Sequence, residues 1–158
     1  MSNAAAATST PRRGVFPALQ THPGADHLTQ PFWDAAKQGQ LVGYQCQSCG
    51  TVLLPPKPIC FKCGSETFEW VELPGTGVVY SRIIVRHPLR EDLAEVCPYV
   101  TGVIELDGTQ GAGARMIANI VDCEADAVAI GDRVEVVFDH INEEMAVPRF
   151  RPIADSYK

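Results

Sequence analysis

Two Cys-x-x-Cys-Gly units in the N-terminal half constrain the fold of this chain more than any other feature. They occupy residues 46–50 and 60–64, and ten residues separate Cys49 from Cys60. Two residues between cysteines allow one tight turn to aim both sulfurs at a metal ion about 2.3 Å away. We therefore expect one zinc ion bound by four thiolates, those of Cys46, Cys49, Cys60 and Cys63.

A glycine follows each cysteine pair, Gly50 in the first unit and Gly64 in the second. Glycine adopts a positive φ without steric cost, and this conformation turns backbone N–H groups toward the thiolate sulfurs. Such contacts spread the charge of four thiolates around a divalent ion. Three prolines stiffen the connection between the units, so we expect two similar turns that face each other across a short hairpin.

Four protein ligands leave no open coordination position, so we expect a structural metal and not a catalytic one. Iron in the same tetrahedral sulfur site is the main alternative to zinc. Disulfides within the pairs would imply redox function, but no thioredoxin-like βαβ pattern surrounds them. Residues 1–13 lack the apolar segment of a secretory signal, which favours the reducing cytoplasm. The isolated Cys97 and Cys123 are expected to be small buried or half-buried packing residues.

The residues around the cysteine segment predict an arm and a helix before it. Residues 1–25 are rich in proline, glycine and small polar residues and are predicted to form an extended arm. A short helix follows, with Thr29 as its N-cap, Pro31 in its first turn and Gly39 as a left-handed C-cap. Phe32 and Trp33 are large for so short a helix. They either pack on the rest of the fold or dock a partner.

Beyond the cysteines, the pattern changes to short strands separated by turn residues. The predicted strands cover residues 78–86, 99–106, 114–121, 133–139 and 149–153. Five short strands in a segment of this length suit a small antiparallel barrel or a sandwich, and the five-stranded OB barrel has the right size. We therefore divide the chain into an arm (1–25), a helix plus zinc ribbon (26–70) and an OB-fold domain (71–158). No run of eighteen apolar residues predicts a membrane span.

Charge argues against binding to nucleic acid. The formal net charge is −6, and residues from Glu72 onward contain 8 Lys and Arg against 15 Asp and Glu. An acidic surface repels the phosphate backbone. The four histidines do not lie at metal-ligand spacing, and no nucleophile elbow or phosphate-binding loop is present. The sequence therefore offers no catalytic constellation.

One basic segment interrupts the acidic half, from Pro148 to Pro152. Two arginines flank Phe150 there, and the two prolines favour a rigid extended strand. The arginines either form salt bridges at the edge of a barrel or contact an anion or a partner, because guanidinium groups suit phosphate and carboxylate.

The order of these residues resembles a known family, the zinc-ribbon OB-fold proteins that accompany thiolase-superfamily enzymes. The resemblance spans roughly residues 26–155. It rests on Pro31-Phe32-Trp33-Asp34-Ala35-Ala36, Gly39-Gln40-Leu41, Cys46-x-x-Cys49-Gly50, Pro55-Pro56, Cys60-x-x-Cys63-Gly64, Trp70-Val71-Glu72, Gly75-x-Gly77-x-Val79-Tyr80-Ser81, Pro98-Tyr99-Val100, Ile130-Gly131-x-x-Val134-Glu135-Val136 and Pro148-Arg149-Phe150-Arg151-Pro152.

The resemblance implies a mainly β protein, with an N-terminal helical arm, a rubredoxin-like zinc ribbon and a five-stranded OB-fold barrel. It also implies a non-catalytic subunit of a hetero-oligomer that makes or cleaves carbon–carbon bonds in acyl-CoA, of the β-oxoacyl-CoA thiolase or aldolase type. The partner would be a thiolase-like or 3-hydroxy-3-methylglutaryl-CoA-synthase-like protein. This chain would act as a scaffold and help to form the CoA channel. Arg149, Phe150, Arg151 and Tyr80 are the candidate contacts to CoA or the partner.

Two other functions stay open at this point. A single-stranded nucleic-acid-binding protein can combine a zinc ribbon with an OB fold, but it needs a basic groove with stacking aromatic residues. A stand-alone acyl-CoA-binding protein or enzyme would need its own binding site within this chain.

Overall fold

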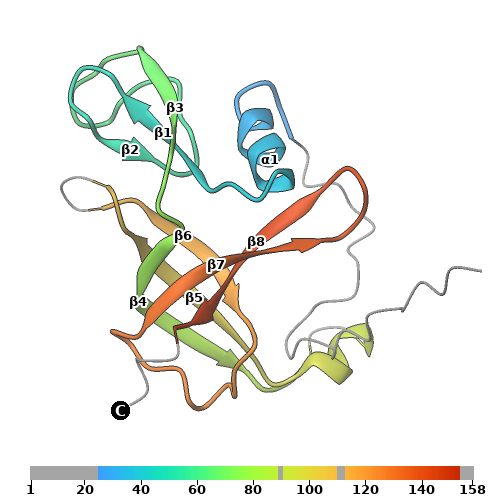
Figure 1. The fold of residues 1–158 in the computed structure, drawn as a ribbon. Coiled ribbons are helices and arrows are strands. Elements are labelled where there is room, and N and C mark those ends of the chain that lie inside the picture. The colour runs from blue at the N-terminus through green and yellow to red at the C-terminus, as the bar shows by residue number, and fades with distance from the viewer. Residues whose placement is uncertain (1–24, 89–90, 110–112, 154–158) are drawn as a thin grey trace, which may run out of the picture.

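A computed structural model describes residues 25–88, 91–109 and 113–153, which form one α-helix, a small zinc-ribbon sheet and a closed barrel (Figure 1). A short 3-10 helix, η1 (Glu91–Val96), lies between the first two barrel strands. The predicted fold class, mainly β with a ribbon followed by a five-stranded barrel, is confirmed. The predicted arm lies outside the described residues except for Ala25. Among the described residues, no helix is long and apolar enough to cross a membrane.

Helix α1 spans Gln30–Lys37, with Pro31 in its first turn, as predicted. Thr29 occupies the N-cap position, but its side chain makes no capping hydrogen bond. Its hydroxyl instead makes two hydrogen bonds to Asp26. It accepts one from the Asp26 backbone N–H at 3.0 Å and donates one to the Asp26 carboxylate at 2.8 Å. The Asp26 carboxylate in turn accepts the backbone N–H of Thr29 at 2.8 Å. The predicted N-cap position is therefore correct, but the predicted capping hydrogen bond is not formed, because the threonine hydroxyl bonds to Asp26 in the turn before the helix.

The ribbon contains β1 (Val42–Cys46), β2 (Val52–Leu53) and β3 (Phe68–Glu72), in the antiparallel order β2-β1-β3. Tyr44 lies at the centre of its aromatic face. Its ring stacks on Phe68 with centroids 4.5 Å apart, and Trp70, directly across from it in the ladder, is 5.0 Å away. Aromatic cross-strand pairs of this kind stabilise a sheet too small to bury a core of its own.

The barrel contains β4 (Thr76–Val85), β5 (Tyr99–Leu106), β6 (Arg115–Ile120), β7 (Arg133–His140) and β8 (Ala146–Pro152). It closes in the order β4-β5-β6-β8-β7. All neighbours are antiparallel except β6 and β8, which run parallel where Ile120 faces Phe150. These five strands are the five that the sequence predicts, and they form an OB-fold barrel.

Strand β8 begins at Ala146, three residues before its predicted start. Pro148 lies within this strand, although proline cannot donate to a ladder. In the barrel, β8 pairs with β7 along its length, from Ala146 to Pro152, but meets β6 only at Phe150. A proline is tolerated where one side of a strand is unpaired.

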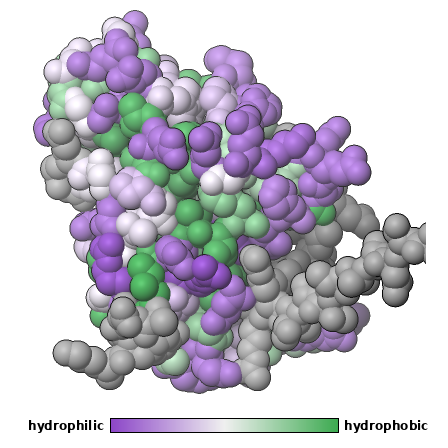
Figure 2. All heavy atoms as spheres, viewed as in Figure 1, coloured by the Kyte–Doolittle hydropathy of each residue, from purple (hydrophilic) through white to green (hydrophobic). Residues whose placement is uncertain are grey.

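The helix, ribbon and barrel share one apolar core. Phe32 from α1, together with Leu41, Val52 and Leu73 from the ribbon and its connection, packs in the same cluster as the inner face of the barrel. Trp33 is half-buried and packs edge-on against Phe32, with centroids 5.2 Å apart. Figure 2 shows apolar side chains gathered where ribbon and barrel meet, while hydrophilic side chains cover the outer end of the ribbon. The ribbon is therefore attached through packing as well as through the chain.

Candidate functional site

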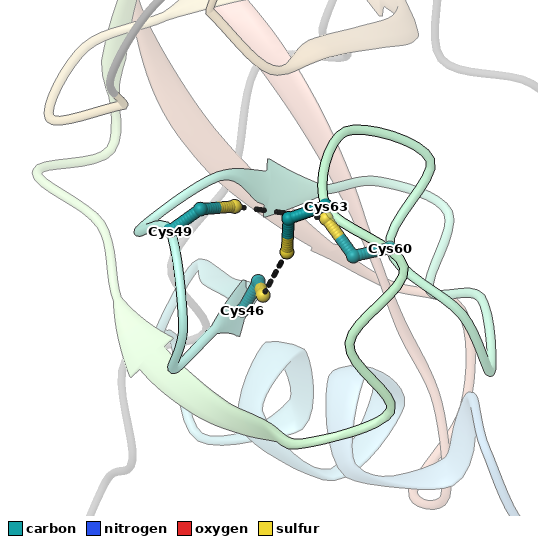
Figure 3. A group of neighbouring side chains, drawn as sticks. All are labelled: Cys46, Cys49, Cys60 and Cys63. Carbon is teal, nitrogen blue, oxygen red and sulfur yellow. Dashed lines mark hydrogen bonds between the residues drawn. The ribbon is translucent and has the colours of Figure 1, made fainter.

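The four cysteines of the two turns converge on one point (Figure 3). Their sulfur atoms all lie within 4.8 Å of one another. The Sγ atoms of Cys46 and Cys63 are 3.6 Å apart, and those of Cys49 and Cys60 are 3.7 Å apart. A tetrahedral ion with bonds of about 2.3 Å separates its ligands by about 3.8 Å. The spacing therefore fits a tetrahedral metal ion, as the sequence predicts.

The two cysteine turns have the same backbone hydrogen bonds. Gly50 N–H donates to the Cys46 carbonyl and Gly64 N–H to the Cys60 carbonyl, each at 2.8 Å. Both glycines have the positive φ that the sequence predicts, 71° and 74°. The backbone N–H groups of Cys46 and Cys60 close each turn by donating, at 2.9 Å, to the carbonyls of Thr51 and Ser65.

Backbone N–H groups also point at the sulfurs. Burial opposes ionisation of Cys46, but the N–H groups of Cys49 and Ser48 outweigh it and lower the pKa of this thiol. The pKa of Cys49 falls to about 6, because the Thr51 hydroxyl, 3.2 Å away, and the Thr51 N–H both stabilise its thiolate. The turns are thus built to hold negative sulfur.

Cys63 shows why such a cluster needs a cation. The Ser65 N–H favours its thiolate, but the neighbouring sulfurs of Cys49, Cys46 and Cys60 raise its pKa to about 12. Four sulfurs this close cannot all ionise without a counter-charge, and a divalent ion supplies one. The donor set, the spacing and the N–H contacts all fit zinc in a structural site.

The two remaining cysteines lie outside this cluster. Cys123 is half-buried, and burial together with Asp122 and Glu124 raises the pKa of its thiol to about 11. A thiol held in its protonated form is a weak nucleophile. Cys97 is also half-buried, next to Pro98. Both placements agree with packing residues.

The candidate CoA or partner contacts differ in their access to solvent. Arg149 is 4% exposed, and its guanidinium donates to Asp139 at 2.9 Å and to Asn119 at 2.7 Å. Phe150 is fully buried in the barrel core. Arg151 is exposed and pairs with Glu135 at 2.7 Å. Both arginines therefore form salt bridges in a barrel strand.

Tyr80 is 51% exposed, at the irregularity in β4 between Val79 and Ser81. The guanidinium of Arg115 lies 3.5 Å above its ring. Burial thus withdraws Arg149 and Phe150 from ligands in solution, while Arg151 and Tyr80 stay accessible.

The structure also brings together residues that sequence analysis did not single out. Lys57, Phe61 and Lys62 of the cysteine segment line one hollow together with Arg115 of the barrel. The sequence contained one indication of this cluster, because two of the four lysines in the chain lie within the cysteine segment. Their proximity to Arg115 depends on the packing of ribbon on barrel.

Comparison with protein families assigns both halves of the structure. Residues 33–69 match the family described as "ChsH2, rubredoxin-like zinc ribbon domain". Residues 70–139 match "ChsH2, C-terminal OB-fold domain". The two matches adjoin at the end of the ribbon.

Two curated relatives illustrate the range of sequences to which the chain is similar. It is 43% identical over 105 residues to a "DUF35 domain-containing scaffold protein" of Methanocaldococcus jannaschii, covering 66% of this chain and 71% of that protein. It is 36% identical over 135 residues to a "Probable enoyl-CoA hydratase alpha subunit" of Thermomonospora curvata, covering 85% of this chain. The chain spans only 40% of the length of that hydratase subunit.

Solved structures give the same picture. A chain of the "Ltp2-ChsH2(DUF35) aldolase" matches with a TM-score of 0.72 at 35% identity, covering 83% of this chain and 98% of that one. A DUF35 protein of unknown function from Sulfolobus solfataricus matches with a TM-score of 0.57 at 17% identity, covering 84% of this chain and 90% of that one, which shows the shared fold alone. With both domains matched in order and a scaffold relative at 43% identity, the chain belongs to the DUF35 family of ChsH2-type zinc-ribbon and OB-fold proteins.

Proposed function

We propose that this chain is a non-catalytic, zinc-stabilised subunit of a complex that makes or cleaves carbon–carbon bonds in acyl-CoA substrates. A thiolase-superfamily partner supplies the reacting groups. The observation that supports this most strongly is the likeness to a chain of the Ltp2-ChsH2(DUF35) aldolase, which extends over 98% of that chain at 35% identity.

The chemistry of the described residues supports a non-catalytic role. Carbon–carbon bond chemistry on thioesters needs a nucleophile and a base in a dry pocket. The four cysteines with metal spacing are committed to a closed site, and Cys123 is held as a thiol. Three described carboxylates have lowered pKa values. Asp126 and Asp107 lie in exposed or half-exposed ion pairs with Arg86 and Arg133, and Asp26 accepts hydrogen bonds from Thr29 in the turn before α1. The described part of the chain thus presents no catalytic constellation.

The surface supports a role in assembly. Several large apolar side chains are exposed, and the most exposed among the described residues are Phe61 at 75%, Ile117 at 73% and Ile130 at 67%. Large apolar side chains are frequent at the centres of protein interfaces, so these positions are candidates for contact with the partner.

The partner is a thiolase-like protein, and a 3-hydroxy-3-methylglutaryl-CoA-synthase-like protein is a second candidate of the same superfamily. The complex works in the cytoplasm. This chain acts as its scaffold and contributes to the wall of the CoA channel, where Arg151 and Tyr80 are the accessible members of the predicted contact set. The hydratase names belong to relatives of which this chain spans about two fifths or less, so hydration is not proposed. The 15 acidic against 8 basic residues from Glu72 onward oppose a nucleic-acid function.

The test is capture and reconstitution. The tagged full-length chain is expressed in its source organism, and co-purifying proteins are identified by mass spectrometry. The partner found is then produced with and without this chain and assayed for cleavage and condensation of acyl-CoA. We expect a thiolase-superfamily protein whose activity or solubility depends on this chain. Recovery of no such protein, or full activity and solubility of the recovered partner without this chain, would refute the proposal.

A further inference from the structure

A small hollow at the end of the barrel remote from the ribbon is lined by both cysteines that lie outside the metal cluster (Figure 1). Cys97 belongs to the connection from β4 to β5 and directly follows η1, the short yellow helix in the figure. Cys123 belongs to the connection from β6 to β7, three residues after β6 ends. The hollow has a volume of about 200 Å³, and both thiols are free and half-buried at its wall.

The register of the β5–β6 ladder, continued past its end, places the two cysteines opposite each other. The last pair at this end is Val100 with Ile120. Cys97 lies three residues before Val100, and Cys123 lies three residues after Ile120. Opposite residues of antiparallel strands have Cα atoms about 4.5–5.5 Å apart, within the range of about 4.4–6.8 Å that a disulfide requires. The chains separate beyond the last pair, with the hollow between them, so a bond between the two sulfurs requires that this hollow closes.

An ion pair already holds the same two connections side by side. Arg86, directly after β4, pairs with Asp126, three residues after Cys123. The two side chains are 55% and 70% exposed, so the pair is weak and permits small movements of the connections. Both cysteines also lie outside the strands, so their approach breaks no hydrogen bond of the ladders.

We infer that Cys97 and Cys123 form a reversible disulfide that locks the β4–β5 connection to the β6–β7 connection. The oxidant is a low-molecular-weight disulfide of the glutathione type. The Cys97 thiolate attacks one of its sulfurs, a mixed disulfide forms at Cys97, and one small thiol leaves. Cys123 then loses its proton and attacks the Cys97 sulfur, which releases the second small thiol. Two protein thiols are oxidised, and one small disulfide is reduced to two thiols.

The surroundings of Cys123 determine the order of these steps. Burial, Asp122 and Glu124 raise the pKa of its thiol to about 11, which makes it a poor group to start the exchange. It is better suited to the second step, in which the sulfur that it attacks is held next to it. In a reducing compartment such a bond is transient, so the pair would respond to oxidising conditions. The inference rests on the positions of the two cysteines and is independent of the proposed function.

The test uses the full-length, zinc-loaded chain, equilibrated in mixtures of reduced and oxidised glutathione and then quenched with iodoacetamide. Trypsin places the two cysteines in separate peptides, residues 91–115 and 116–133. We expect a monomer lighter by two hydrogen atoms, with a disulfide that joins these two peptides. Metal analysis of the same sample should still find zinc bound, which separates this reaction from oxidation of the four metal ligands.

Variants assign the two roles. Cys123→Ser should trap the mixed disulfide at Cys97, whereas Cys97→Ser should leave Cys123 largely unreacted. The matched control, Cys123→Ser with Ala127→Cys, moves the thiol to an exposed residue of the same connection outside the hollow. It should form mixed disulfides with glutathione in place of the link. In the parent, the link should raise the melting temperature by about 7–14 °C, because it restricts the unfolded chain.

Four results would overturn the inference. They are no link at any glutathione ratio at which zinc stays bound, stable mixed disulfides at both cysteines of the parent, a link between two chains, and a linked monomer whose melting temperature is unchanged or lower. The last result would mean that the bond forms only in a partly unfolded chain. Peptide mapping of the parent needs no substitution, so a variant that fails to fold leaves the test intact. None of these results depends on whether a thiolase-superfamily partner is found.

Discussion

Replacement of Arg149 by leucine tests whether this arginine serves the barrel or a ligand. The arginine side chain is 5% exposed and that of its partner Asp139 is 19% exposed. Removal of one partner from a buried ion pair costs about 3–5 kcal/mol, because the other charge is left uncompensated. Asp139 keeps some contact with water, which places the cost near the lower value, and the lost bond to Asn119 adds about 1 kcal/mol. We expect a loss of about 4 kcal/mol.

Arg151→Leu is the matched control, two residues along the same strand. Its ion pair with Glu135 has side chains 47% and 41% exposed. Exposed pairs contribute about 0–1 kcal/mol, so this variant should be nearly as stable as the parent. The double variant Arg149→Leu/Asp139→Leu should recover much of the loss, because no unpaired charge stays in the barrel.

The assay is urea unfolding of each zinc-loaded variant, followed by far-UV circular dichroism, with the midpoints compared at constant slope. At about 2–4 °C per kcal/mol for a chain of this size, Arg149→Leu should also lower the melting temperature by about 8–16 °C. Equal stability of the Arg149→Leu and Arg151→Leu variants would refute the assignment of Arg149 to the barrel interior.

Three further perturbations probe the metal, the barrel wall and the ion pairs. Chelation of the metal, or Cys60→Ser, should abolish the near-UV dichroism of the ribbon aromatic residues. Metal analysis of the parent should find one zinc per chain. A folded parent without zinc or iron would contradict this prediction. Gly77→Ala should destabilise the barrel by about 1–3 kcal/mol in urea unfolding, because the alanine Cβ would lie 2.5 Å from the Glu105 carbonyl oxygen. An unchanged unfolding midpoint would contradict this close approach of the two strands. The hydrogen bonds from Arg133 and Thr76 lower the pKa of Asp107 below 3.8, so the stability from this pair is present above pH 3.8 and is lost as the pH falls through the folded pKa. Asp107→Asn should therefore reduce the slope of stability against pH below about 4, which acid titration in urea can measure.

Local sequence was sufficient for the metal centre. The Cys-x-x-Cys-Gly spacing places two sulfurs and the N–H groups that face them within one turn, so neighbours along the chain define most of the geometry. The positive φ of Gly50 and Gly64 follows from the same local requirement. The barrel strands were predictable for a similar reason, because most of them are short runs of apolar or alternating residues bounded by turn residues.

The burial of the segment from Pro148 to Pro152 was not predictable from its own residues. Arg149 and Arg151 have the same side chain on the same strand, yet one is buried and the other exposed. The difference depends on neighbours distant in sequence, since Arg149 reaches Asn119 of β6 and Asp139 of β7, while Arg151 reaches Glu135. In a closed barrel, such contacts are set by strand order.

By itself, the sequence predicted a metal site of two cysteine turns followed by five short strands, because spacing and periodicity act over a few residues. Only the tertiary structure decided which charged residues face solvent. Packing the ribbon on the barrel brings Lys57 and Lys62 beside Arg115 across more than fifty residues of chain, and it creates a groove that no local pattern contains. The physical reason is that charge and burial at a surface depend on all the elements that meet there.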